Sequence, residues 1–261
     1  MNPATLLSLG AAVLQLGFAV GFTLLAGAPG WQRARLYALM AFAAAAYSGS
    51  DVLVTIPGIP AATLRAVVAA NYLFGAINVA LWLVLAFSAP THPWWRLPRP
   101  IGSLTALTIG LGLLAQIPGV VTTTGIEVLH LPRMHTTYYQ PPVTWVSGVV
   151  SMWFVAMLLV VVMRFAHAAR RGEPDALTHL IAYAWFFACA VVELLVANRV
   201  VEFVYLADAG FLGVVAVLLI VTIRRVVRDA HRLDALGREL SDQIEHRTRE
   251  RDLARDALTH A

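Results

Sequence analysis

Long apolar segments are the feature that most constrains how this chain folds. A membrane-spanning helix needs about 20 consecutive, mostly apolar residues. Seven segments meet this requirement, and they cover residues 4–27, 36–56, 66–88, 101–121, 143–163, 177–197 and 204–223. The sequence therefore predicts an all-α membrane protein, with a seven-helix transmembrane bundle in residues 1–223. Because only residues 198–203 separate the last two segments, six spans with a long hairpin is the alternative.

Charged residues are distributed unevenly along the chain. Residues 1–223 contain 10 Arg and 7 acidic residues, whereas residues 224–261 contain 9 Arg and 8 acidic residues. A water-soluble fold is therefore excluded for the first part, and membrane burial is excluded for the second. All 19 basic residues are Arg, which excludes a retinal bound through a lysine Schiff base. The single cysteine, Cys189, excludes a disulfide framework and a cysteine-based zinc site. No cofactor is expected.

Arginines between the predicted spans indicate the orientation in the membrane. Ten of them follow the first, third, fifth and seventh spans, and three lie on the opposite side. Cytoplasmic loops of membrane proteins are enriched in Arg and Lys. The N-terminus is therefore predicted outside the cell and the C-terminus in the cytoplasm. This rule explains the net charge of +4 without a nucleic-acid partner, and membrane lipid is the expected surrounding.

Residues 224–261 are predicted to form a cytoplasmic helix with a narrow apolar seam. The seam consists of Leu233, Leu236, Leu240 and Ile244, whose spacing of 3, 4 and 4 places them on one helix face. A single helix cannot bury such a seam, so a parallel homodimeric coiled coil is expected, and deleting residues 233–261 is expected to weaken self-association. A solvated, charged tail is the alternative.

The same tail resembles a known signalling element. Residues 236–250 read Leu-Gly-Arg-Glu-Leu-Ser-Asp-Gln-Ile-Glu-His-Arg-Thr-Arg-Glu, and Leu253 and Leu258 follow. This pattern resembles the linker helix that joins membrane sensors to output domains in bacterial sensor histidine kinases and, less often, in diguanylate cyclases. Seven spans before it are similar to the seven-transmembrane sensor regions of such kinases. The resemblance implies the sensory input module of a two-component sensor histidine kinase, in the bacterial inner membrane.

The resemblance also implies partners that act in the cytoplasm. They are a kinase output domain, which is an ATP-dependent protein-histidine phosphotransferase, and through it a response regulator. The phosphoacceptor box of such kinases has the form H-E/D-x-x-x-P, and neither His246 nor His260 begins one. A Gly-rich ATP lid and a GG(D/E)EF-like sequence are also missing from the sequence. The chain is therefore expected to carry no catalytic domain and to stop just before its output domain.

Polar residues inside the predicted spans are the candidate functional residues, because such groups are costly in a bilayer. The candidates are Asp51, Asn71, Tyr72, Asn78, Tyr183, Glu193 and Arg199. They predict a pocket open to the outside, ringed by aromatic residues such as Tyr72 and Trp145, for a small-molecule or lipid ligand. Glu202 and Asp208 are left out of this pocket, because they are expected close to water at the start of the seventh span.

An alternative explanation for the same residues is structural. Polar side chains in membrane bundles also form hydrogen bonds between helices. In this interpretation Arg199 pairs with Asp51 or Glu193 and holds the bundle together. The two interpretations do not exclude each other.

The longest predicted outer loop, residues 122–142, contains three weak candidates for metal ligands: Glu127, His130 and His135. Their spacing matches no strong zinc pattern, so no metal site is expected. The segment is expected to be an ordinary outer loop. A short hairpin that caps the outer mouth of the bundle is the alternative.

Other classes of function fit the sequence less well. A transporter or channel is expected to show an internal repeat and more acidic residues at mid-membrane depth, and it would give the charged tail no role. A membrane enzyme would need a cluster of His, Asp and Glu near one face. The D/E-R-Y and N-P-x-x-Y motifs of eukaryotic G-protein-coupled receptors are missing from the third and seventh spans. A receptor input is therefore the main prediction, and a diguanylate cyclase input or a small transporter or channel is the alternative.

Overall fold

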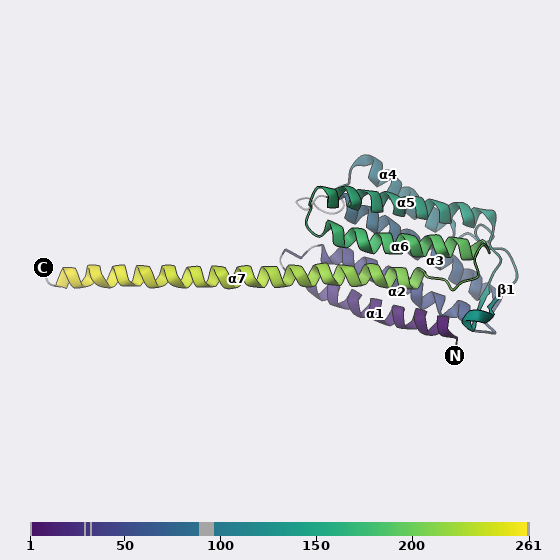
Figure 1. Cartoon of the computed structure of the whole chain (residues 1–261), viewed down its shortest axis with the longest axis horizontal. Helices are drawn as coiled ribbons and strands as arrows, with labels where there is room; N and C mark the ends of the chain where they lie inside the picture. Colours follow the sequence, from purple (N-terminus) through teal and green to yellow (C-terminus); the bar gives the residue numbers. More distant parts are fainter. Residues whose placement is uncertain (1, 29, 32, 89–96, 260–261) are drawn as a thin grey trace. The chain divides into compact units, whose positions relative to one another are not determined.

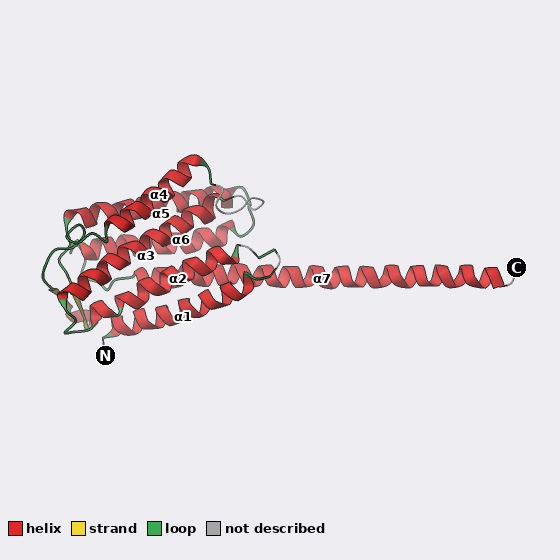
Figure 2. Cartoon of the chain, turned by 180° about the vertical axis from the view of Figure 1, so that it is seen from behind, coloured by secondary structure: helices red, strands yellow, loops and turns green. Residues whose placement is uncertain are grey.

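The fold is mostly helical, as the sequence predicts (Figures 1 and 2). It was obtained as a computed structural model, which describes residues 2–28, 30–31, 33–88 and 97–259. The helices are α1 (Pro3–Leu25), α2 (Ala34–Asp51), α3 (Ala61–Phe87), α4 (Arg99–Leu114), α5 (Trp145–Arg170), α6 (Ala176–Ala197) and α7 (Ala207–Thr259). Two short 3-10 helices, η1 (Leu53–Thr55) and η2 (Pro132–Met134), and two strands, β1 (Glu127–Leu131) and β2 (Thr136–Gln140), complete the fold. Contacts divide the chain into residues 1–218 and residues 219–261, which are described separately.

Six helices in the described part of the chain are long and apolar enough to cross a membrane: α1, α2 with η1, α3, α5, α6 and α7. The chain therefore has the character of a multi-pass membrane protein. Helix α4 differs from the predicted span over residues 101–121, because it ends at Leu114 after 16 residues. At a rise of 1.5 Å per residue it is about 24 Å long, which is less than the roughly 30 Å hydrocarbon thickness of a bilayer. Turns follow it, and Gly119 adopts the positive φ of 84° that such turns favour.

Helix α3 is central to the bundle, because it packs against α2, α4 and α5. Its residue Trp82 is 1% exposed and links α3 to two other helices. The Trp82 ring lies edge-on to Tyr183 and Phe186 of α6, with centroid distances of 5.6 and 4.7 Å, and 5.8 Å from Phe211 of α7. Buried aromatic contacts of this kind make α3, α6 and the first turns of α7 one packed unit.

A β-hairpin closes one end of the bundle. Strands β1 and β2 pair antiparallel, with Glu127 opposite Gln140 and Leu131 opposite Thr136. The structure therefore contains the hairpin that the sequence offered as the alternative to an ordinary loop. Leu131 and Tyr138 pack in one apolar cluster with residues of α1, η1 and α3. The Asn2 side-chain amide donates to the Thr137 carbonyl at 2.7 Å, so the N-terminus lies at this end of the bundle.

Residues 219–259 belong to helix α7 and carry the charged sequence. The seam residues Leu233, Leu236, Leu240 and Ile244 are between 58% and 70% exposed in the single chain. Ion pairs at i,i+4 spacing, Asp234 with Arg238 and Glu245 with Arg249, lie on exposed parts of the helix. Exposed pairs of this kind add a few tenths of a kcal/mol to helix stability. The side chains of the seam are therefore accessible to a second helix.

Candidate functional site

A cavity of about 230 Å³ lies inside the helical bundle. Helices α2, α3, α5, α6 and α7, strand β2 and the loop between α6 and α7 all contribute to its wall. Most of the lining is apolar, and the aromatic residues in it are Tyr47, Tyr72, Trp82, Phe154, Phe186, Tyr205 and Phe211. An apolar cavity with a few converging polar groups is the usual form of a small-molecule site.

Asp51 lies at the C-terminal end of α2 and lines the cavity. Its carboxyl Oδ1 accepts a hydrogen bond from the Asn71 side-chain amide of α3 at 2.5 Å. The Ser50 hydroxyl donates to the Asn71 Oδ1, so the amide is held from both sides. The sequence predicted that Asp51 and Asn71, as polar residues inside the spans, would contribute to a common pocket, and both line this cavity.

Glu193 of α6 also lines the cavity and connects three helices. Its Oε1 accepts a hydrogen bond from the Tyr47 hydroxyl of α2 at 3.1 Å. Its Oε2 accepts one from the backbone N–H of Ala207 at 2.7 Å. Ala207 is the first residue of α7, where backbone N–H groups have no partner inside the helix. A carboxylate at a helix N-terminus is stabilising, so Glu193 holds the start of α7 against the cavity.

Four of the seven candidate residues line the cavity, and three do not. Tyr72, whose hydroxyl lies 3.4 Å from Ser151, lines it together with Asp51, Asn71 and Glu193. Asn78 is 1% exposed and donates to the Phe74 carbonyl within α3, and Tyr183 is buried in the aromatic core. Arg199 is not part of the lining. Trp145, which the sequence predicted among the aromatic residues around the pocket, is 81% exposed and is not part of it either.

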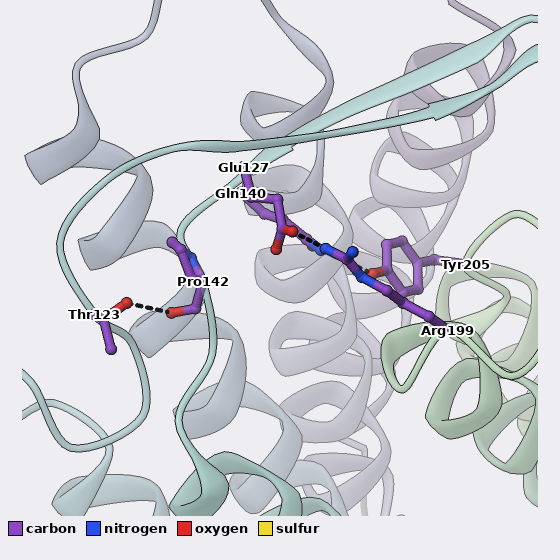
Figure 3. Close-up of polar contacts among 6 residues, drawn as sticks. All are labelled: Thr123, Glu127, Gln140, Pro142, Arg199 and Tyr205. Carbon is purple, nitrogen blue, oxygen red and sulfur yellow. Dashed lines mark hydrogen bonds and ion pairs between the residues drawn. The ribbon is translucent and has the colours of Figure 1, made fainter.

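Arg199 pairs with a different acid from the two expected. Its guanidinium forms an ion pair with Glu127 of β1, not with Asp51 or Glu193 (Figure 3). The residue adopts a left-handed backbone conformation with φ of 58° after the end of α6. The ion pair therefore ties the α6–α7 loop to the hairpin, and it leaves the two cavity carboxyls without this cation.

Tyr205 forms a second link between the α6–α7 loop and the hairpin (Figure 3). Its hydroxyl lies 3.2 Å from both side-chain polar atoms of Gln140 of β2, and both residues line the cavity. The Tyr205 backbone N–H donates to the Tyr138 hydroxyl at 3.2 Å, and the two rings lie 4.8 Å apart. Burial raises the pKa of both phenols, that of Tyr205 to about 12, so both are neutral at physiological pH.

The alkaline titration of Tyr205 follows from this burial. The folded pKa of about 12 lies above the ordinary value of about 10, so the phenol contributes stability below pH 10 that is lost as pH rises through 12. We expect the difference in tyrosinate absorbance between the native protein and Tyr205→Phe to have its midpoint near pH 12. A midpoint near pH 10 would contradict the buried position.

Sequence reasoning missed Tyr47 and misjudged the burial of Asp208. Tyr47 lines the cavity, and its place four residues before Asp51 on the same helix face was an available signal. Asp208 was excluded as close to water, but it is 4% exposed and accepts a hydrogen bond from Ser8 of α1. Asp208 is not part of the cavity lining, but the reason for leaving it out, closeness to water, was wrong because Ser8 of α1 packs against it, a contact that no local pattern in the sequence encodes.

Two of the three potential metal ligands of the hairpin have other partners. Glu127 pairs with Arg199, and the His130 ring nitrogen Nδ1 lies 2.8 Å from the Thr137 hydroxyl. His135 occupies a left-handed position with φ of 50° directly after η2. Within the described residues, no three His, Cys, Asp or Glu side chains come close enough to hold a metal ion.

Comparison with known protein families and with curated proteins finds no match for this chain.

Proposed function

We propose that this chain is the transmembrane input module of a sensory receptor, in which a ligand in the cavity changes the position of α7. The observation that carries the proposal is the place of α7 at the cavity. Ala207 and Phe211 line it, and the cavity residue Glu193 holds the N-terminal N–H of the same helix. A ligand whose charge lies near Glu193 acts directly on this contact.

The signal would travel along α7 into the charged tail. The helix is continuous from Ala207 to Thr259, and its seam residues are exposed in the single chain. A parallel homodimeric coil through this seam would convert a displacement of α7 into a change between two helices. Such a switch needs about 1–3 kcal/mol of differential ligand binding between its two states.

The output that fits best is a histidine kinase. The tail resembles the linker helix of bacterial sensor histidine kinases, so the proposal includes control of autophosphorylation and transfer to a response regulator. It also includes seven spans in a bacterial inner membrane, with the N-terminus outside, as the arginine distribution predicts. Helix α4 would then cross with its 16 helical residues and the turns that follow it.

A fusion experiment tests this function without knowledge of the ligand. The chain is joined after Ala261 to the catalytic region of a histidine kinase. A series of fusions is made in which the length of the junction increases one residue at a time over one helical turn. In the fusion with measurable activity, Asp51→Asn and Glu193→Gln are expected to change basal autophosphorylation about fivefold or more, because they alter the contacts that set the two states.

Glu202→Gln is the matched control for this experiment. Glu202 is exposed, lies close to α7 in sequence and does not line the cavity. The control is expected to leave autophosphorylation unchanged. Equal activity of all three variants and the unmodified fusion would contradict the proposed function.

A further inference from the structure

The charge of the cavity is the first indication of its ligand. Asp51 and Glu193 line it, and its lining contains no Arg or His among the described residues, in a chain without Lys. Arg199, the cation expected beside these acids, is held by Glu127 at the hairpin. A buried carboxylate is unfavourable without a positive partner. The cavity therefore disfavours anions and is complementary to a cation.

The aromatic lining is the second indication. Tyr47 and Phe211 lie 4.9 Å apart between ring centroids, and Tyr72 and Phe154, also in the lining, lie 6.4 Å apart. Aromatic faces attract organic cations, and cages of such residues bind quaternary ammonium groups. Ca²⁺ and Mg²⁺ take about six oxygen ligands, and within the described residues no three His, Cys, Asp or Glu side chains come close enough to hold a metal ion.

The hydrogen bonds already present distinguish between kinds of ammonium ion. Asp51 accepts from Asn71, and Glu193 accepts from Tyr47 and from the Ala207 backbone. A primary ammonium carries three N–H donors that all need acceptors. A tertiary ammonium carries one N–H and a quaternary ammonium none, and their alkyl groups suit an aromatic wall. The volume of about 230 Å³ is below the usual 300–1,000 Å³ of ligand pockets, so the cation must be small.

We propose that the cavity binds a small tertiary or quaternary ammonium cation, with its charge near the Asp51 and Glu193 carboxyls and its alkyl groups against the aromatic faces. This inference rests on the proposed function in that the cation is the signal that the receptor detects. It adds a ligand class and the residues that select it.

Direct binding to the purified full chain in lipid nanodiscs tests the proposal. The probes are choline and its neutral carbon isostere, 3,3-dimethylbutan-1-ol, which have nearly the same shape. Choline is expected to bind at least about tenfold more tightly, because only choline carries the charge. Equal affinities, or no choline binding at millimolar concentrations, would overturn the proposal.

Variants of cavity residues test whether choline binds in the cavity. Glu193→Gln is expected to weaken choline binding about tenfold or more, and Asp51→Asn serves the same purpose if the first variant does not fold. Glu202→Gln, outside the cavity, is expected to bind choline as the native protein does. Phe154→Leu keeps an apolar side chain and is expected to weaken choline binding more than binding of the neutral isostere. Affinities that do not change in any cavity variant would place the choline elsewhere and overturn the proposal.

The two proposals fail in distinguishable ways. A change in basal autophosphorylation of the fusion variants, without choline binding, supports the receptor function and overturns the ligand class. Choline binding that depends on Glu193, with fusion activity insensitive to the same residue, supports the ligand class and overturns the receptor function.

Discussion

Replacing Gly112 with valine is expected to destabilise the helical bundle by about 3 kcal/mol. Gly112 lies on α4 where this helix packs against α3. A Cβ atom at this position would lie 2.5 Å from the Ala76 Cβ and 3.3 Å from the Leu73 Cα. Neither neighbour is the end of a flexible side chain, so the two helices would have to move apart. Close helix approach at small residues is a main source of stability in membrane bundles.

The measurement is thermal unfolding of the purified chain in one detergent, followed by circular dichroism. Gly110→Val is the matched control, because Gly110 is exposed on the same helix and a Cβ there meets nothing within 4 Å. Both variants gain the same helix propensity, so that contribution cancels in the comparison. We expect a clearly lower midpoint for Gly112→Val alone. Equal midpoints for the two variants would contradict the α3–α4 contact.

The second large effect is expected from charge placed in the seam of α7. Leu236→Glu combined with Leu240→Glu is expected to weaken self-association at least about 100-fold. A fully buried leucine contributes about 1.5–3 kcal/mol, and a parallel dimer would lose four of them. The acids would also repel each other across the dimer axis. Analytical ultracentrifugation of the chain in detergent over a range of concentrations measures this change.

The control places the same two charges on other faces of the helix. Ala235→Glu with Ser241→Glu leaves the four seam residues intact, and both positions are exposed. This variant is expected to associate as the native chain does. If both double variants behave like the native chain, then the seam does not join two copies, and the coiled-coil proposal is wrong.

The sequence predicted the elements whose character depends on local composition. Apolar segments of about 20 residues become apolar helices, because a helix satisfies its own backbone hydrogen bonds wherever it lies. The seam of α7 was predictable because residues three and four apart share a helix face. Asp51, Asn71 and Glu193 were found for a related reason, since each is a costly polar group in an apolar helix and points to a polar partner.

Only the tertiary structure decided which of these groups meet. Arg199 pairs with Glu127 because the hairpin lies beside the α6–α7 loop, and these two residues are far apart in the sequence. Asp208 is buried because Ser8 of α1 packs against it. Helix α4 ends at Leu114, and turns and bends occupy the rest of the apolar segment up to Val121. Local periodicity specifies helices and their faces, but the choice of partner depends on long-range packing, and this packing assembled the cavity.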